Sequence, residues 1–106
     1  MSSAAKAATF SCKAANRFAL DGAIDIDSAG ALLVAGEAAV RDGSDEQVGI
    51  DLAGVVASDS AGLALLIELI SVARSANRGL VYENMPSQVR QLARLSEVEE
   101  LLQKGA

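Results

Sequence analysis

The sequence predicts an α/β domain in which helices pack against a mixed sheet of four or five strands. Two short segments that alternate apolar and polar residues flank an Ala-Asn turn, and strand-like and helix-like patterns then alternate along the chain. Parallel strands need a crossover between them, so a hairpin followed by such alternation indicates a mixed sheet. The predicted order is ββαβαβαα, and a length of 106 residues fits one domain.

A short hairpin is predicted near the start of the chain. Residues 9–14 and 17–21 each alternate apolar and polar side chains, and Asn16 between them tolerates the positive φ that a tight turn requires. Gly22 is expected to end the second strand. Residues 1–8 are small and polar with no long apolar run, so they are predicted to be a disordered tail, and residues 9–106 a single domain.

A helix, a strand and a second helix follow the hairpin. Leucine, glycine and valine recur at helical spacing over residues 27–41, where Asp27-Ser28 offers an N-terminal cap and a glycine follows the last turn. Residues 47–52 alternate with their apolar side chains on one face, and they are expected to form a central strand. Residues 60–77 then form the most apolar helix of the chain.

The last part of the chain predicts one strand and two short helices. Residues 80–83 form a strand between a glycine and an Asn-Met-Pro segment. Ser87 is expected to cap the next helix. Ser96 and Glu99 have the Ser-x-x-Glu spacing of a capping box, which predicts the start of a final helix.

Composition narrows the range of partners. The net charge is −5 and aromatic residues make up 3% of the chain, which argues against binding of nucleic acid or anionic lipid, because both need basic surfaces. The longest apolar run, Gly62–Ile67, is far too short to cross a membrane, so no direct membrane insertion is expected. The chain is predicted to be soluble and cytoplasmic, and any role at a membrane would then run through a partner protein.

The residues that usually carry chemistry are scarce. The single cysteine, Cys12, excludes an internal disulfide, and its place in an alternating strand predicts a buried apolar side chain. Histidine is absent, and no glycine-rich phosphate loop or cluster of metal ligands appears, so the sequence predicts no enzyme, no metal and no cofactor. Helix starts and solvated turns explain the spaced acidic residues Asp25, Asp27, Asp42 and Asp45 better than a metal site does.

The junction between the central strand and the apolar helix is the most informative part of the chain. Ser58, Asp59 and Ser60 are all good helix-start residues, although one cap needs only one of them. If Asp59 or Ser58 provides the cap, the Ser60 hydroxyl lies at the positive end of the helix, where it can bind a partner or carry a phosphate. The ordinary alternative is that all three simply favour a helix start.

The helix that begins at Ser60 also predicts a contact surface. At about 100° per residue, most of its apolar side chains share one broad arc that must pack on the sheet. The remaining strip places Ser60, Ala64, Ile67 and Ser71 in a line, which we call the contact ridge. Small side chains let a partner approach closely and an exposed isoleucine can fill a pocket, although single exposed apolar residues are also common without any function.

The junction resembles the pattern of the STAS domain family. Ile50-Asp51-Leu52 followed by Asp59-Ser60-Ala61-Gly62-Leu63 is similar to the family's strand ending in Asp-Leu and helix starting in Asp-Ser/Thr-small-Gly-Leu. The resemblance covers about residues 10–102 and implies the STAS fold, a mixed sheet with helices on one side. Residues 62–66 and 89–95 most resemble the family's lipid-transporter branch.

The resemblance implies a protein that binds other proteins. The transporter branch implies a non-catalytic subunit that binds the ATPase subunit of a phospholipid ABC transporter in Gram-negative bacteria and supports its assembly or activity. The partner-binding residues would be Asp59, Ser60, Ala61, Ala64, Ile67 and Ser71. The alternative is an anti-sigma factor antagonist that binds an anti-sigma kinase and is phosphorylated at Ser60. The antagonist motif commonly has a second serine where this chain has Ala61, which favours the transporter branch.

Overall fold

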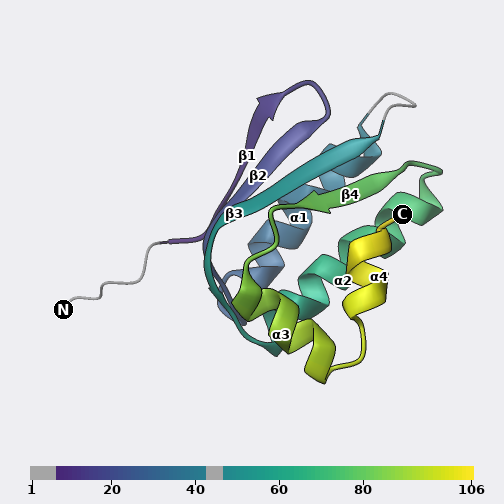
Figure 1. Ribbon diagram of the computed structural model, residues 1–106. Helices are drawn as coiled ribbons and strands as arrows, with labels where there is room; N and C mark the ends of the chain where they lie inside the picture. Colours follow the sequence, from purple (N-terminus) through teal and green to yellow (C-terminus); the bar gives the residue numbers. More distant parts are fainter. Residues whose placement is uncertain (1–6, 43–46) are drawn as a thin grey trace.

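The computed structural model describes residues 7–42 and 47–106, and its elements follow the predicted order (Figure 1). They are β1 (Thr9–Ala14), β2 (Arg17–Ile24), α1 (Ala29–Arg41), β3 (Val48–Ser58), α2 (Ser60–Ser75), β4 (Leu80–Glu83), α3 (Ser87–Leu95) and α4 (Glu99–Lys104). Of the four or five strands expected, the described residues form four.

The four strands form one mixed sheet in the order β1-β2-β3-β4. β1 pairs antiparallel with β2, whereas β2, β3 and β4 are parallel to one another. Right-handed crossovers that advance across a sheet in one direction place their helices on the same face. α1 and α2 accordingly pack together, and Figure 1 shows the helices gathered on one side of the sheet. β3 lies between β2 and β4, which confirms the predicted central strand.

The predicted apolar arc of α2 is confirmed. Its buried residues are Gly62, Leu63, Leu65, Leu66, Leu69, Ile70, Val72 and Ala73. On β4, the Tyr82 hydroxyl donates a hydrogen bond of 2.7 Å to the carbonyl oxygen of Leu66, and burial raises the pKa of Tyr82 far above its usual range. The arc and this hydrogen bond fix α2 against the sheet, which sets the position of its first turn.

Both β2 and β3 are longer than predicted. β2 continues through Gly22 to Ile24, and Gly22 adopts a φ of +89°, which glycine reaches without strain. A Cβ at Gly22 would lie 2.6 Å from the carbonyl oxygen of Ala7. Gly22 therefore does not end the strand but allows the chain before β1 to pass close to β2.

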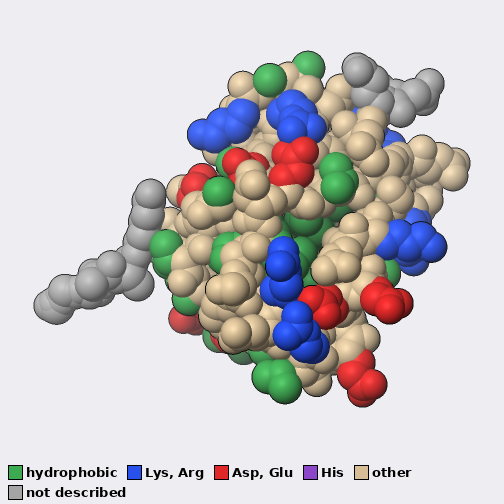
Figure 2. Space-filling view, viewed as in Figure 1, with side chains coloured by type: hydrophobic (Ala, Val, Ile, Leu, Met, Phe, Trp, Pro, Cys, Tyr) green, Lys and Arg blue, Asp and Glu red, His purple; other side chains and the backbone are tan. Residues whose placement is uncertain are grey.

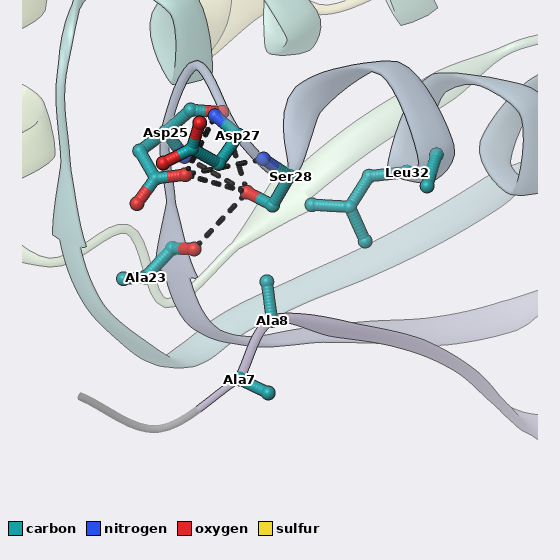
Figure 3. Close-up of a pocket in the computed structure, with 8 residues that line it drawn as sticks. Ala7, Ala8, Ala23, Asp25, Asp27, Ser28 and Leu32 are labelled. Atoms are coloured by element: carbon teal, nitrogen blue, oxygen red, sulfur yellow. Dashed lines mark hydrogen bonds between the residues drawn. The ribbon is translucent and has the colours of Figure 1, made fainter. Parts of the chain in front are cut away.

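The start of α1 is held differently from the prediction. Ser28 makes no side-chain cap bond to the helix, whereas Oδ1 of Asp25 accepts hydrogen bonds from the backbone N–H groups of Asp27 and Ser28 at 3.0 and 3.1 Å. Figure 3 shows Asp25 and Ser28 turned toward each other beside Ala23. The turn at Asp25 replaces the predicted cap because its carboxylate reaches the N–H groups two and three residues ahead.

Neither predicted cap of the last two helices forms. Ser87 is the first residue of α3 itself, with Pro86 in the cap position and no side-chain cap bond. Ser96 ends α3 instead of starting α4, and the expected capping-box partner Glu99 forms an ion pair with Arg94 at 3.2 Å. An N-cap residue has an extended backbone and directly precedes a helix. Ser96 instead directly follows the last residue of α3, so it cannot act as an N-cap.

The N-terminal region departs from prediction at Cys12, which is exposed instead of buried. β1 is an edge strand, and on this part of the hairpin the stacked rings of Phe10 and Phe18, with centroids 5.2 Å apart, provide the apolar contact. Ala8, which the sequence places in the tail, packs against the core. Residues 1–6 of the predicted tail lie outside the described residues.

Candidate functional site

The candidate site is the junction between β3 and α2, where the Asp59 side chain makes two hydrogen bonds. Oδ1 accepts from the backbone N–H of Gly62 at 3.0 Å, so Asp59 is the cap of α2. Oδ2 accepts from the backbone N–H of Ile26, in the loop between β2 and α1, at 3.2 Å. The hydrogen bond from Gly62, and to a lesser degree that from Ile26, lowers the pKa of Asp59. One carboxylate thus holds both the helix start and the neighbouring loop.

The two serines on either side of Asp59 differ in their surroundings. Ser58 is buried, and its hydroxyl donates to the carbonyl oxygen of Asp59 at 3.0 Å. Ser60 is exposed at the first residue of α2, and within the described part of the chain its hydroxyl has no hydrogen-bond partner. Because Asp59 provides the cap, the Ser60 hydroxyl is available to another molecule.

The contact ridge on α2 is largely exposed. Ser60, Ala64 and Ser71 are exposed, as the helix pattern predicts. Ile67 is only half-exposed and packs against the core, so it is not the exposed anchor that the sequence predicts. α3 and α4 also pack against α2.

An open apolar groove of about 340 Å³ lies between α1 and α2, next to the contact ridge. It is lined by Ala29, Gly30, Leu33, Ala61, Ala64, Leu65 and Glu68. Ala61 and Ala64, both predicted to bind a partner, therefore form part of its α2 wall. Since most of the lining side chains are small, the groove has room for an apolar side chain of another protein.

Ile26 is a candidate contact residue that the sequence analysis does not identify. Its side chain is 75% exposed, and its backbone is bonded to Asp59, so it lies beside the junction. A large exposed apolar side chain beside the junction is a further candidate for contact with a partner protein. The sequence signal was an isoleucine between Asp25 and Asp27, in a loop where no core position was expected.

The face of the sheet away from the helices is charged. Arg17 on β2 reaches over β3 to Glu83 on β4, with 2.7 Å between nitrogen and oxygen. It passes over Gly49, where a Cβ would lie 2.5 Å from the guanidinium. On another side of the molecule, where β4, α3 and α4 lie in front, Figure 2 shows basic and acidic side chains interspersed as well. These features are typical of a solvated surface, in contrast to the groove between α1 and α2.

The remaining polar groups form no further reactive cluster in the described part of the chain. A hollow of about 380 Å³ beside the start of α1 is lined by Asp25 and Asp27 (Figure 3), but the Asp25 carboxylate is already used in the turn before the helix. Among residues 7–42 and 47–106 no three potential metal ligands come together. None of the described helices has the length and apolar character needed to span a bilayer.

Asp59→Asn is expected to remove a pH-dependent part of the stability. Hydrogen bonds to the ionised carboxylate hold the folded-state pKa of Asp59 below the unfolded value of about 3.9. Ionised Asp59 therefore stabilises the fold above about pH 4, and this contribution is lost as the pH falls through the folded-state pKa. Urea midpoints should show the wild type to be more stable than the variant at neutral pH, with the difference shrinking in acid.

Asp27→Asn is the matched control for this measurement. Asp27 lies in the loop beside Ile26, and no hydrogen bond to its carboxylate occurs within the described residues. Its replacement should change the acid dependence less than Asp59→Asn does. A difference between wild type and Asp59→Asn that stays constant from neutral pH into acid would show that the charge of Asp59 does not strengthen the cap.

Comparison with known proteins agrees with this geometry. The family model described as "Mlab, STAS domain" matches residues 11–103. Among solved structures, the anti-sigma factor antagonist SpoIIAA in its unphosphorylated form has a TM-score of 0.69 and 14% sequence identity, over 89% of this chain and 84% of that chain. At this identity the likeness concerns the fold alone. No curated protein matches the chain. Because the family model spans nearly all of the chain, this protein belongs to the STAS domain family, in its Mlab type.

Proposed function

We propose that the chain is a non-catalytic accessory subunit of an ABC-type phospholipid transporter, of the kind that maintains the lipid asymmetry of the outer membrane. It binds the ATPase subunit through the junction and the contact ridge, and it supports the assembly or activity of that subunit. The protein is cytoplasmic and reaches the inner membrane only through this partner. Membership of the Mlab type of the STAS family supports the transporter branch.

One observation carries the proposal: the Ser60 hydroxyl is exposed beside an apolar groove that small side chains line. The carboxylate of the preceding residue, Asp59, is engaged by two backbone N–H groups and has a lowered pKa. Such a carboxylate is a poor general base for a serine hydroxyl. The arrangement therefore favours recognition of a protein surface over nucleophilic catalysis.

Ser60→Glu and Ala64→Arg are each expected to weaken binding to the ATPase subunit at least about tenfold, because each places a long charged side chain on a surface that becomes desolvated in the complex. Both residues are exposed, so the variants should keep the wild-type fold. Co-purification and titration calorimetry with the purified ATPase subunit measure the effect.

Two exposed positions provide matched controls. Ser75→Glu makes the same chemical change at the far end of α2, and Ala35→Arg does so on α1 at a residue that does not line the groove. Both should bind like the wild type. If Ser60→Glu and Ala64→Arg also bind like the wild type, the docking surface is misplaced. Ile67→Asp is a poor test, since Ile67 packs against the core.

The second candidate function is that of an anti-sigma factor antagonist controlled by phosphorylation of Ser60. The exposed hydroxyl at the first residue of α2 favours it, because a helix N-terminus stabilises a phosphate group. Intact mass measurement of the protein isolated from its native cells distinguishes the two. A phosphate at Ser60 would support the antagonist, whereas its absence under all growth conditions would contradict this function.

A further inference from the structure

Among the described residues, the last part of β3 has no strand neighbour on its β4 side. β4 pairs with β3 only over Val48–Asp51, whereas β3 continues to Ser58. On the β2 side, Ser58 is in register with Ile24, whose carbonyl oxygen accepts from the N–H of Asp59 at 3.4 Å. In a parallel pair the N–H and C=O of one residue point to the same neighbour. Those of Ser58 therefore point toward the side that β4 leaves empty.

The side chain of Gln88, in the first turn of α3, fills this place. The Ser58 N–H donates to Oε1 of Gln88 at 3.0 Å, and Nε2 of Gln88 donates to the Ser58 carbonyl oxygen at 3.0 Å. A primary amide offers an acceptor and a donor side by side, as a peptide group does. Gln88 thus satisfies a buried backbone unit that would otherwise be left unpaired at a high cost.

Ser58 links Gln88 to the residues of the docking surface. Its hydroxyl donates to the carbonyl oxygen of Asp59 at 3.0 Å, and Asp59 caps α2 and bonds the loop at Ile26. The position of Ser58 therefore determines the direction in which the chain turns from β3 into α2 at Ser60. We infer that Gln88 is a positioning residue that couples α3 to the junction and fixes how Ser60 is presented to the partner. The binding part of this inference rests on the proposed function, and the positioning part does not.

Gln88→Met and Gln88→Glu test the inference, with Gln91→Glu as a matched control. Methionine keeps the length without either hydrogen bond, and glutamate keeps the acceptor but brings an oxygen against the Ser58 carbonyl. Gln91 is exposed on the same helix and makes no hydrogen bond within the described residues. Amide hydrogen exchange of the isolated protein is measured at Ser58, with the buried amide of Leu52 in β3 as the reference.

Gln88→Met should raise the exchange rate at Ser58 about tenfold relative to Leu52, and Gln88→Glu should raise it less, because glutamate keeps an acceptor for the Ser58 N–H. They should also weaken binding to the ATPase subunit several-fold, and Gln91→Glu should change neither quantity. Unchanged exchange at Ser58 in both variants would overturn the positioning role. Faster exchange with wild-type affinity would overturn the coupling to docking. If the wild type itself fails to bind the ATPase subunit, the proposed function is wrong, and the exchange rates alone then decide whether Gln88 positions the junction.

Discussion

Gly62→Ala is expected to destabilise the domain by about 3 kcal/mol, although alanine is the better helix former. A Cβ at Gly62 would lie 2.1 Å from the carbonyl oxygen of Ile24 and 2.5 Å from the hydroxyl oxygen of Ser58. The first of these atoms belongs to the backbone of β2, so it cannot move without shifting the strand. The first turn of α2 would have to move away from the sheet.

Gly30→Ala is the control, because it makes the same change in another helix. A Cβ at Gly30 in α1 meets nothing within 4 Å, so alanine there should stabilise the protein by up to about 1 kcal/mol. If contact with Ile24 decides the outcome at Gly62, urea unfolding should show that Gly62→Ala lowers the free energy of unfolding and that Gly30→Ala raises it. Equal stabilisation by the two substitutions would mean that the start of α2 can move without cost.

The surroundings of Gly62 also show whether the sheet or a partner protein requires a glycine at this position. A glycine beside Ser60 suits close approach by either the sheet or a partner, and the structure places the sheet there, at Ile24. The partner's side of the helix is instead formed by Ala61 and Ala64, which line the groove toward α1. The small residues at the start of α2 thus have two roles. Gly62 allows close contact with the sheet, and Ala61 and Ala64 line the groove.

Periodicity explains why most of the fold could be predicted. The apolar arc of α2 and the buried apolar residues at the start of β3 follow from the spacing of apolar residues, and the positive φ of Asn16 follows from its place in a two-residue turn. Caps could not be predicted equally well, because Asp and Ser side chains can bond several nearby N–H groups. Which of these N–H groups a side chain binds then depends on the path of the chain, as it does at Asp25 and Ser96.

In the candidate site, too, some residues could be identified from the sequence and another could not. Asp59 and Ser60 could be identified from a local pattern, and Asp59 does cap α2. Gln88 could not, because it lies 30 residues from Ser58 in the sequence and reads as an ordinary exposed polar residue of a helix. Its role depends on β4 being shorter than β3, which is a property of the whole sheet. Contacts of this kind follow from the tertiary structure alone.

Arg78→Met is expected to destabilise the domain by about 3 kcal/mol or more, because it removes a buried cation from a network of carbonyl groups. Arg78 is 6% exposed and lies between α2 and β4. Its guanidinium donates to the carbonyl oxygens of Val40 and Asp42 at 2.8 and 3.1 Å and to Oδ1 of Asn16 at 2.6 Å. A single side chain thus ties the C-terminal end of α1 to the β1-β2 hairpin, where the helix dipole also favours a positive charge.

Arg74→Met is the matched control, since Arg74 is exposed and, among the described residues, its guanidinium makes one long contact of 3.4 Å, to the carbonyl oxygen of Gly105. Its loss should cost less than about 1 kcal/mol. Arg78→Lys should fall between the two, because an ammonium group cannot match the planar fork that reaches several acceptors at once. Urea unfolding gives all three values. If Arg78→Met is no less stable than Arg74→Met, burial of the methionine side chain offsets the lost hydrogen bonds, and the guanidinium is not what holds α1 to the hairpin.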